Sequence, residues 1–213
     1  MAGSSLTLCK DKLFKVLVIG DLDVGKSSII LRYASKRFDE GYKSSIGVDF
    51  ALKTIEWDRN TVVRLQLWDI VGQERFKKMS RVYYKGAMGA LVVFDIRNSS
   101  TLEAASNWKQ DLDSKVCLES GRPVPAVLVA NKCDLTGNDS DVAGSLDGFC
   151  IDNSFTCWFK TSAKENVNID EAFAFLVKQM MRCDAGLSNE EDDGGLLKLN
   201  VPREESKSRT PCC

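Results

Sequence analysis

A glycine-rich stretch near the start of the chain constrains the fold more than any other part of the sequence. Residues 20–27 read Gly-Asp-Leu-Asp-Val-Gly-Lys-Ser, which has the spacing G-x-x-x-x-G-K-S. Residues 13–19 before it are typical of a buried strand, and residues 28–34 after it are typical of a helix. In that context the stretch is a phosphate-binding loop, whose backbone N–H groups and helix N-terminus face an anion. We expect Lys26 to reach the β- and γ-phosphates of a nucleotide, and the Ser27 hydroxyl to ligate Mg²⁺.

Composition narrows the class of protein. The chain has 213 residues, enough for one domain and a tail, and its formal net charge of −1 argues against a nucleic-acid partner, which needs a basic face. The longest apolar run, residues 87–94, is too short to span a bilayer, and the first 12 residues lack the apolar core of a signal peptide. Eight cysteines without a C-x-x-C pair, together with no histidine, argue against zinc and favour reduced thiols. These features predict a cytosolic protein.

Strand-like and helix-like segments alternate along the chain, which predicts an α/β fold with a mostly parallel sheet and helices on both faces. Residues 48–57 and 61–70 form two strand-like runs joined by the turn 58–60, and we expect an antiparallel hairpin at the sheet edge. Strands are also expected at 87–95, 124–130 and 155–160, which with 13–19 gives a six-stranded sheet with one antiparallel edge strand. Helices are expected at 102–116, 140–153 and 169–182, the first capped by Ser99, Ser100 or Thr101. Residues 1–11 are expected to be flexible, residues 12–184 to form one domain, and the polar residues 185–213 to form a disordered tail.

Residues 131–134, Asn-Lys-Cys-Asp, directly follow an expected strand, at the edge of the sheet where α/β proteins bind ligands. Guanine carries an N1–H and an N2 amino group side by side, and the Asp134 carboxylate can accept both hydrogen bonds. Adenine offers no such pair, and leaving a buried polar group unpaired can discriminate by about 10⁴ or more. Asn131 can bond the base N7, and the Lys132 stem can cover the ring face.

A second loop, Thr161-Ser162-Ala163-Lys164, follows the next expected strand and can offer backbone N–H groups to the guanine O6. Each of the two loops is a weak signal alone, but in this order and downstream of a phosphate loop they indicate a guanine nucleotide. A P-loop kinase or ATPase is the competing class. Asp134 and the single-domain length argue against it, and competition between GTP and ATP would separate the two.

The motifs together resemble the small GTPases. These are the phosphate loop, Asp69-x-x-Gly72-Gln73-Glu74, Asn131-Lys132-x-Asp134 and Ser162-Ala163-Lys164. Within that group residues 46–50 (Ile-Gly-Val-Asp-Phe), 75–76 (Arg-Phe) and 83–87 (Tyr-Tyr-Lys-Gly-Ala) resemble the Rab branch. Residues 48–53, 64–70 and 108–115 are most similar to the Rab proteins of melanosomes and other lysosome-related organelles. The resemblance covers about residues 12–184, which would then be a P-loop small G-domain, and the last two cysteines.

The resemblance implies a role for each matching residue. Gln73 would orient the attacking water, Asp69 would hold Mg²⁺ through a water, and Ser45 would add a second hydroxyl to the metal. Phe38 would stack on the guanine and Tyr42 would lie over the phosphates, while Gly72 would contact the γ-phosphate. The whole implied nucleotide site is Asp23, Val24, Gly25, Lys26, Ser27, Ser28, Phe38, Tyr42, Ser45, Gly72, Asn131, Lys132, Asp134, Ser162, Ala163 and Lys164, with Ser27, Ser45 and Asp69 at the metal.

The resemblance also implies a molecular switch of vesicle traffic that uses GTP, GDP and Mg²⁺ and hydrolyses GTP slowly. Segments near 37–47 and 70–82 would be ordered by the γ-phosphate and released on hydrolysis. The implied partners are an exchange factor, a GTPase-activating protein that supplies an arginine, a GDP-dissociation inhibitor or escort protein, and GTP-dependent effectors. The implied effector surface comprises Ile46, Phe50, Trp68, Phe76 and Tyr83.

Three positions depart from the Rab pattern. Asp23 stands where Rab proteins usually carry glycine; its carboxylate would repel phosphate and suit a positive φ less well, so we expect weaker affinity and faster exchange. Ser45 replaces the usual threonine and is expected to loosen the first switch. Val71 replaces the usual alanine and is expected to slow hydrolysis by displacing its neighbours. Harmless drift is one alternative, and a hydrolysis-impaired or fast-exchanging nucleotide-binding scaffold is another.

The chain ends in Cys212-Cys213, which is not a C-a-a-X motif. Rab proteins commonly end in two cysteines that both carry geranylgeranyl groups, and two such chains anchor a protein stably. The resemblance therefore implies attachment to the cytoplasmic face of intracellular membranes, including endosomal or lysosome-related ones, beside a soluble cytosolic pool.

Overall fold

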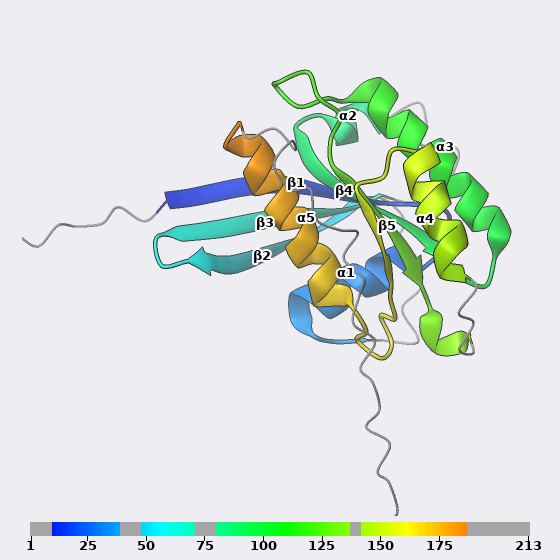
Figure 1. Cartoon of the computed structure of the whole chain (residues 1–213). Coiled ribbons are helices and arrows are strands. Elements are labelled where there is room, and N and C mark those ends of the chain that lie inside the picture. The colour runs from blue at the N-terminus through cyan, green and yellow to red at the C-terminus, as the bar shows by residue number, and fades with distance from the viewer. Residues whose placement is uncertain (1–9, 39–47, 71–79, 137–141, 187–213) are drawn as a thin grey trace, which may run out of the picture.

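The fold is built around a six-stranded sheet with the strand order β2-β3-β1-β4-β5-β6. The computed structural model describes residues 10–38, 48–70, 80–136 and 142–186 (Figure 1). The strands are β1 (Lys10–Ile19), β2 (Val48–Asp58), β3 (Thr61–Ile70), β4 (Ala87–Asp95), β5 (Ala126–Asn131) and β6 (Cys157–Lys160). Every neighbouring pair is parallel except β2 and β3, which confirms the predicted mostly parallel sheet with one antiparallel edge strand.

Helices cover both faces of this sheet, as the alternating pattern predicts. They are α1 (Lys26–Ser35), α2 (Ser80–Tyr84), α3 (Ser99–Lys115), α4 (Val142–Asp152) and α5 (Ile169–Asp184), with a short 3₁₀ turn at Cys133–Leu135. Buried residues of α1 and α5 pack on one face, and those of α2, α3 and α4 on the other. Among the described residues no helix has the length and apolar character needed to span a membrane.

The central strand β1 shows why the chain needs both layers. Val16 and Val18 belong to the cluster beneath α1 and α5, whereas Leu17 and Ile19 belong to the cluster beneath α3 and α4. Successive side chains of a strand point to opposite faces, so an uninterrupted apolar run is stable only when both faces are covered. The five described cysteines are free thiols.

The predicted cap of α3 is wrong. Asn98, one residue before the three candidates, caps the helix by accepting the Ser100 backbone N–H at 3.1 Å. The Thr101 hydroxyl makes different bonds, since it donates to the Asn98 carbonyl at 2.6 Å and accepts the Asp95 backbone N–H at 3.1 Å. Asn98 comes first in the chain and has the extended backbone of an N-cap, which leaves the later hydroxyls inside the first turn.

Several predicted boundaries also shift by a few residues. β1 begins at Lys10 and not at Leu13, because Lys10–Leu13 continue the parallel pairing with β3. β6 begins at Cys157 and not at Phe155, whose buried ring instead packs beside Phe149, 6.2 Å between centroids. The β6 error arises from an apolar residue that is buried outside the strand, and the β1 error from charged residues that continue the strand.

The order of the strands places the site. β1, β4, β5 and β6 run parallel, so the loops that follow them meet at one edge of the sheet. These loops carry residues 20–25, 96–98, 132–136 and 161–168. Ligands of open α/β sheets bind at this carboxyl edge.

Candidate nucleotide-binding site

The phosphate loop after β1 requires its two glycines for steric reasons. Gly20 and Gly25 have φ angles of 142° and 97°, a region that other residues rarely adopt. A Cβ at Gly20 would lie 2.1 Å from the Val93 carbonyl oxygen, and one at Gly25 would lie 2.4 Å from Nδ2 of Asn131. The glycines therefore let the loop pack closely against β4 and β5.

Lys26, the first residue of α1, is a buried cation suited to an anionic ligand. It is 7% exposed, and its ammonium donates to the Asp21 carbonyl at 2.5 Å. Burial lowers the pKa of Lys26 to about 8, although the nearby carboxylates of Asp69, Asp21 and Asp23 act in the opposite direction. None of the ion pairs within the described ranges includes Lys26. A phosphate at the loop would supply the negative charge that this ammonium lacks.

Two oxygen groups meet beside the loop at the predicted metal position. The Ser27 hydroxyl, in the first turn of α1, donates to the carboxylate of Asp69 near the end of β3. Asp69 is 5% exposed. The described residues contain no group of three or more His, Cys, Asp or Glu that could hold a metal alone. A hydroxyl and one carboxylate nevertheless suit Mg²⁺, which keeps several waters and takes further oxygens from phosphates.

Asn131, at the end of β5, connects the phosphate loop to the loop after β6. Its side chain is 1% exposed; Nδ2 donates to the Val24 carbonyl at 2.8 Å, and Oδ1 accepts from the Ala163 backbone N–H and the Thr161 hydroxyl, each at 3.3 Å. The phosphate loop and the loop after β6 are thus held at a fixed distance from each other. The predicted bond from Asn131 to the base N7 stays a prediction.

Asp134 and Ser162 come from the two predicted base loops and lie in direct contact. The Ser162 hydroxyl donates to Oδ1 of Asp134 at 2.5 Å and accepts the Glu165 backbone N–H at 3.0 Å. Ser162 is fully buried, whereas Asp134 is exposed. The buried serine therefore orients a carboxylate that faces outward, as an acceptor for a base would have to be.

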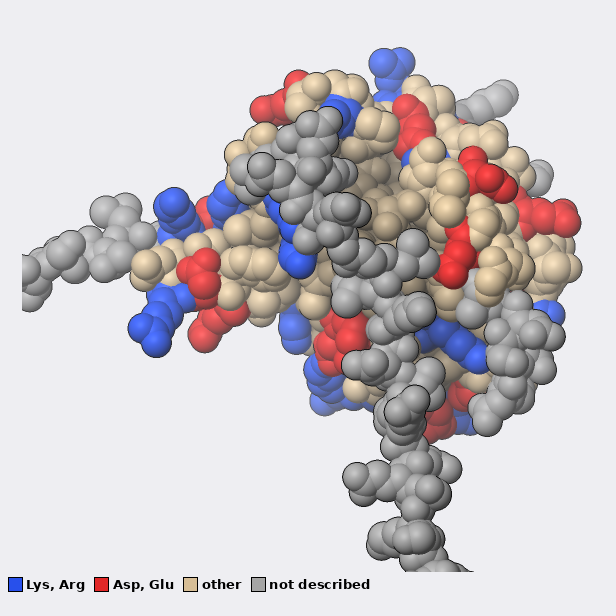
Figure 2. Space-filling model, in the orientation of Figure 1, with Lys and Arg blue, Asp and Glu red and all other residues tan. Residues whose placement is uncertain are grey.

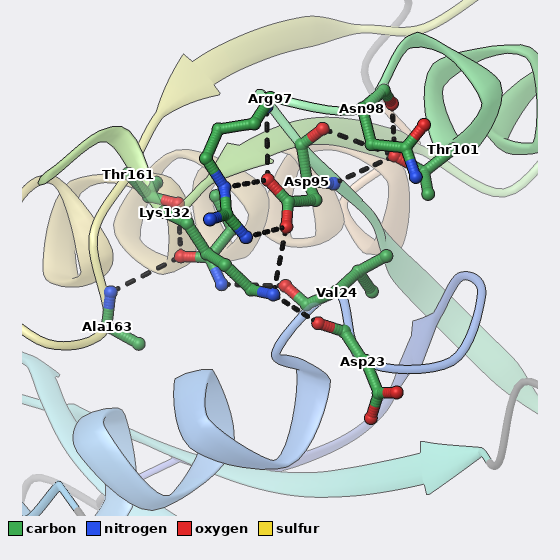
Figure 3. Close-up of polar contacts among 10 residues, drawn as sticks. Asp23, Val24, Asp95, Arg97, Asn98, Thr101, Lys132, Thr161 and Ala163 are labelled. Atoms are coloured by element: carbon green, nitrogen blue, oxygen red, sulfur yellow. Dashed lines mark hydrogen bonds and ion pairs between the residues drawn. The ribbon is translucent and has the colours of Figure 1, made fainter. Parts of the chain in front are cut away.

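Lys132 spans the gap between β4 and the phosphate loop (Figure 3). Its ammonium donates to the Asp23 carbonyl and lies 2.9 Å from Oδ2 of Asp95. Its Cε passes 4.0 Å from the position of a Cβ on Gly25. The stem of Lys132 is therefore extended over the loop, as covering a ring face requires.

Some residues that support the site were not predicted from the sequence. Arg32 of α1 donates to the Ala163 and Lys164 carbonyls, both at 2.7 Å, and so fixes the loop after β6. The Trp108 indole N–H of α3 donates to the Asp21 carboxylate at 2.8 Å. Each contact joins residues at least 87 positions apart in the chain, so a local sequence pattern cannot predict it.

The remaining predicted residues divide into two groups. Phe38 lies at the end of a described segment, packed on the cluster beneath α1 and α5, with the Arg32 guanidinium 5.7 Å from its ring. Phe50 and Trp68 stack with centroids 6.1 Å apart, Phe50 is 61% exposed, and Tyr83 packs with Trp68 against the cluster beneath α3 and α4. The residues that lie outside the described ranges are Tyr42, Ser45, Ile46, Val71, Gly72, Gln73, Phe76, Cys212 and Cys213.

Asp23 has the positive φ expected at its position, 59°, and its side chain is exposed. A non-glycine residue in this left-handed region costs about 1–2 kcal/mol, and the carboxylate adds negative charge beside the phosphate loop. We expect Asp23→Gly to slow the dissociation of GDP by about threefold to tenfold, measured with a fluorescent GDP analogue. An unchanged dissociation rate would show that Asp23 is a neutral substitution.

Comparison with known proteins places the chain in a family. The Ras family model matches residues 15–182. The mouse Ras-related protein Rab-32 is 55% identical over 204 residues, covering 96% of this chain and 92% of the mouse protein. Rab-32A of Dictyostelium discoideum is 50% identical over 206 residues (94% and 93%), and human Rab-7L1 is 51% identical over 173 residues (81% and 85%). The chain therefore belongs to the Ras family of small GTPases, in its Rab branch.

Proposed function

We propose that Asp134 selects guanine and the loop around Lys26 binds the phosphates in this Rab protein. As a Rab GTPase the protein binds GTP and GDP with Mg²⁺, hydrolyses GTP to GDP and phosphate, and acts as a switch in membrane traffic. The observation that carries the residue assignment is the convergence on Asn131. It holds Val24 of the phosphate loop and Ala163 of the loop after β6 at the edge where Ser162 orients Asp134.

The base end of the site works by matching donors to acceptors. Asp134 presents carboxylate oxygens to the two adjacent donors of guanine, and the Ser162 hydroxyl fixes their orientation. Backbone N–H groups of the loop 161–164 would add donors for the guanine O6. The stem of Lys132 covers one ring face and Phe38 the other.

The phosphate end works through charge. Lys26 compensates phosphate charge from a buried position, and the amides of Val24 and Gly25 add donors. Ser27 and Ser45 would hold Mg²⁺ directly and Asp69 through a water; when bound, this ion neutralises charge that develops on the β- and γ-phosphate oxygens. Gln73 would orient the attacking water, and Gly72 would bond the γ-phosphate. A GTPase-activating protein would supply the missing arginine, worth about 10³–10⁵ in rate.

Rab proteins in general act with exchange factors, GTPase-activating proteins, a GDP-dissociation inhibitor and effectors. For this chain we assign effector binding to the surface around Phe50, Trp68 and Tyr83, next to the two switch segments. The exposed Phe50 ring stacked on Trp68 supports that assignment, because aromatic side chains are enriched at interfaces.

We also propose that Cys212 and Cys213 carry geranylgeranyl groups. They would attach the GTP-bound protein to the cytoplasmic face of endosomal or lysosome-related membranes, while the GDP-bound form shares a soluble pool. Figure 2 shows charged side chains of both signs on the described residues of one face. A mixed surface of this kind offers little attraction to an anionic membrane, so the lipid would supply the attachment.

Replacing both terminal cysteines by serine tests the membrane proposal. After incubation with a geranylgeranyl transferase system and its escort protein, the parent chain is expected to sediment with vesicles. The Cys212→Ser/Cys213→Ser variant should stay in the supernatant, and each single variant should bind only marginally, because one chain gives reversible attachment. Equal GDP binding by all four proteins controls for folding, and sedimentation of the double variant at the parent's level would refute the proposal.

A further inference from the structure

The end of β4 carries a charged group that the nucleotide site described above does not use. Asp95 is 7% exposed and lies at the carboxyl edge of the sheet, beside Asn131 of β5. Its Oδ1 accepts the backbone N–H and Nε of Arg97 at 3.0 and 3.1 Å, and its Oδ2 lies 2.7 Å from Nη2 of Arg97. Oδ2 also lies 2.9 Å from the Lys132 ammonium. One carboxylate thus binds two cations on the rim of the site (Figure 3).

Lys132 is the residue through which this carboxylate can reach a nucleotide. The ammonium has two neighbours, Asp95 on β4 and the Asp23 carbonyl in the phosphate loop. The lysine backbone is left-handed, with φ 67°, and its side chain lies over the phosphate loop, with Cε 4.0 Å from the position of a Cβ on Gly25. A lysine side chain has large rotamer freedom, and fixing both its tip and its backbone removes that freedom before a ligand arrives.

The Asp95 carboxyl is ionised at neutral pH. Burial alone would raise the pKa of this carboxyl, but hydrogen bonds from Arg97 and Lys132 outweigh burial and hold the pKa well below its ordinary value. A permanently ionised carboxylate at the edge of the interior is a strong partner for an ammonium. By comparison, the ion pair of Arg64 with Asp11 on the surface has both side chains more than half exposed.

We propose that Asp95 is a positioning residue for nucleotide binding: it holds the Lys132 ammonium so that the lysine stem lies extended where the guanine ring binds. The inference rests on the proposed guanine site. Because Lys132 acts at the base end, Asp95 affects GDP and GTP equally. This separates it from groups that contact the γ-phosphate, which favour one nucleotide over the other.

Asp95 also has a structural role, which the experiment must distinguish from the positioning of Lys132. It accepts the Arg97 backbone N–H, and its own backbone N–H is bound by Thr101 of α3, so it also shapes the connection from β4 to α3. A purely structural effect would weaken nucleotide binding whether or not Lys132 carries a charge. A positioning effect requires the lysine ammonium.

A double-mutant cycle separates the two effects. Asp95→Asn keeps the shape and removes the charge, and Lys132→Met keeps an apolar stem without the ammonium. We expect Asp95→Asn to speed the dissociation of fluorescent GDP and GTP analogues by the same factor, about threefold to tenfold. In the Lys132→Met background the same change should have less than about a twofold effect, because the partner is gone. If the double variant instead speeds dissociation by the product of the two single-variant factors, the two side chains act independently and the proposal is overturned.

Asp95→Glu and Asp11→Asn are the companion variants. Asp95→Glu keeps the charge and should dissociate GDP within about twofold of the parent, which also keeps the proposal testable if Asp95→Asn folds poorly. Asp11→Asn breaks a surface ion pair at the far end of β1 and should change nothing. If Lys132→Met speeds dissociation but Asp95→Asn does not, this inference fails and the guanine site stands. If Lys132→Met has no effect, the ammonium does not position the stem and this inference fails, whereas the guanine site is tested separately by Asp134→Asn.

Discussion

Asp134→Asn is expected to weaken GDP binding by about a hundredfold or more and to let xanthosine diphosphate bind in its place. An asparagine amide presents an N–H₂ group to the guanine N2 amino group, so two donors face each other. Xanthine carries a carbonyl at that carbon, which accepts from the same amide. The Ser162 hydroxyl that donates to Asp134 at 2.5 Å can still donate to the asparagine oxygen, so the loop should keep its geometry. Displacement of a fluorescent GDP analogue by each nucleotide measures both changes.

Glu165→Gln is the matched control for this variant. Glu165 is exposed in the same loop, and its side chain has no hydrogen bond to Asp134 or Ser162 in the described structure. The control removes the same unit of negative charge and should leave both affinities unchanged. Loss of GDP affinity without any gain for xanthosine diphosphate would mean that Asp134 supports the fold and does not read the base.

Lys26→Met is expected to have opposite effects on nucleotide binding and on the stability of the nucleotide-free protein. Removing the ammonium should weaken GDP binding by about a hundredfold to a thousandfold, since a charge-assisted bond to phosphate is lost. The same change removes a buried cation without an ion-pair partner among the described residues, so the free protein should unfold at the parent's temperature or above. Thermal melts with and without GDP measure both.

The pH dependence of the free protein gives a second readout. Burial lowers the pKa of Lys26 to about 8, against 10.5 in the unfolded chain. Between these values the unfolded chain binds a proton that the native protein lacks, so the contribution of Lys26 to the free energy of unfolding rises with pH from about 8 to 10.5. Lys26→Met should abolish that rise. If Lys26→Met lowers the stability of the free protein and still binds GDP as tightly as the parent, Lys26 does not have the assigned role in phosphate binding.

The strands could be predicted because each depends on local sequence. An eight-residue apolar run such as 87–94 suits a strand that is covered on both faces, and the two-residue period of 61–70, next to a second strand-like run and a short turn, predicts an antiparallel hairpin. The cap of α3 could not be predicted, because Asn98, Ser99, Ser100 and Thr101 are all good caps and tertiary contacts chose among them.

The residues of the site also divide into those that the sequence predicts and those that only the folded structure reveals. Its motifs are short loops that follow strands, so topology alone brings Gly25, Asn131 and Ser162 to one edge. The residues that hold those loops, Arg32 and Asp95, lie on other elements and act through contacts that only the folded chain creates. Asn131 shows the limit: the sequence marks it as a base ligand, while the structure shows its amide bonded to the protein at both ends.

The most direct measurement of guanine selection by this chain is the affinity of the full-length protein for GDP and for ADP, each with Mg²⁺ and with a chelator. We predict that GDP binds at least about a thousandfold more tightly than ADP, because Asp134 leaves adenine without a matching donor pair. Chelation should weaken GDP binding while preserving the preference for guanine. Equal affinity for the two nucleotides, or GDP binding that is indifferent to Mg²⁺, would contradict the proposed site.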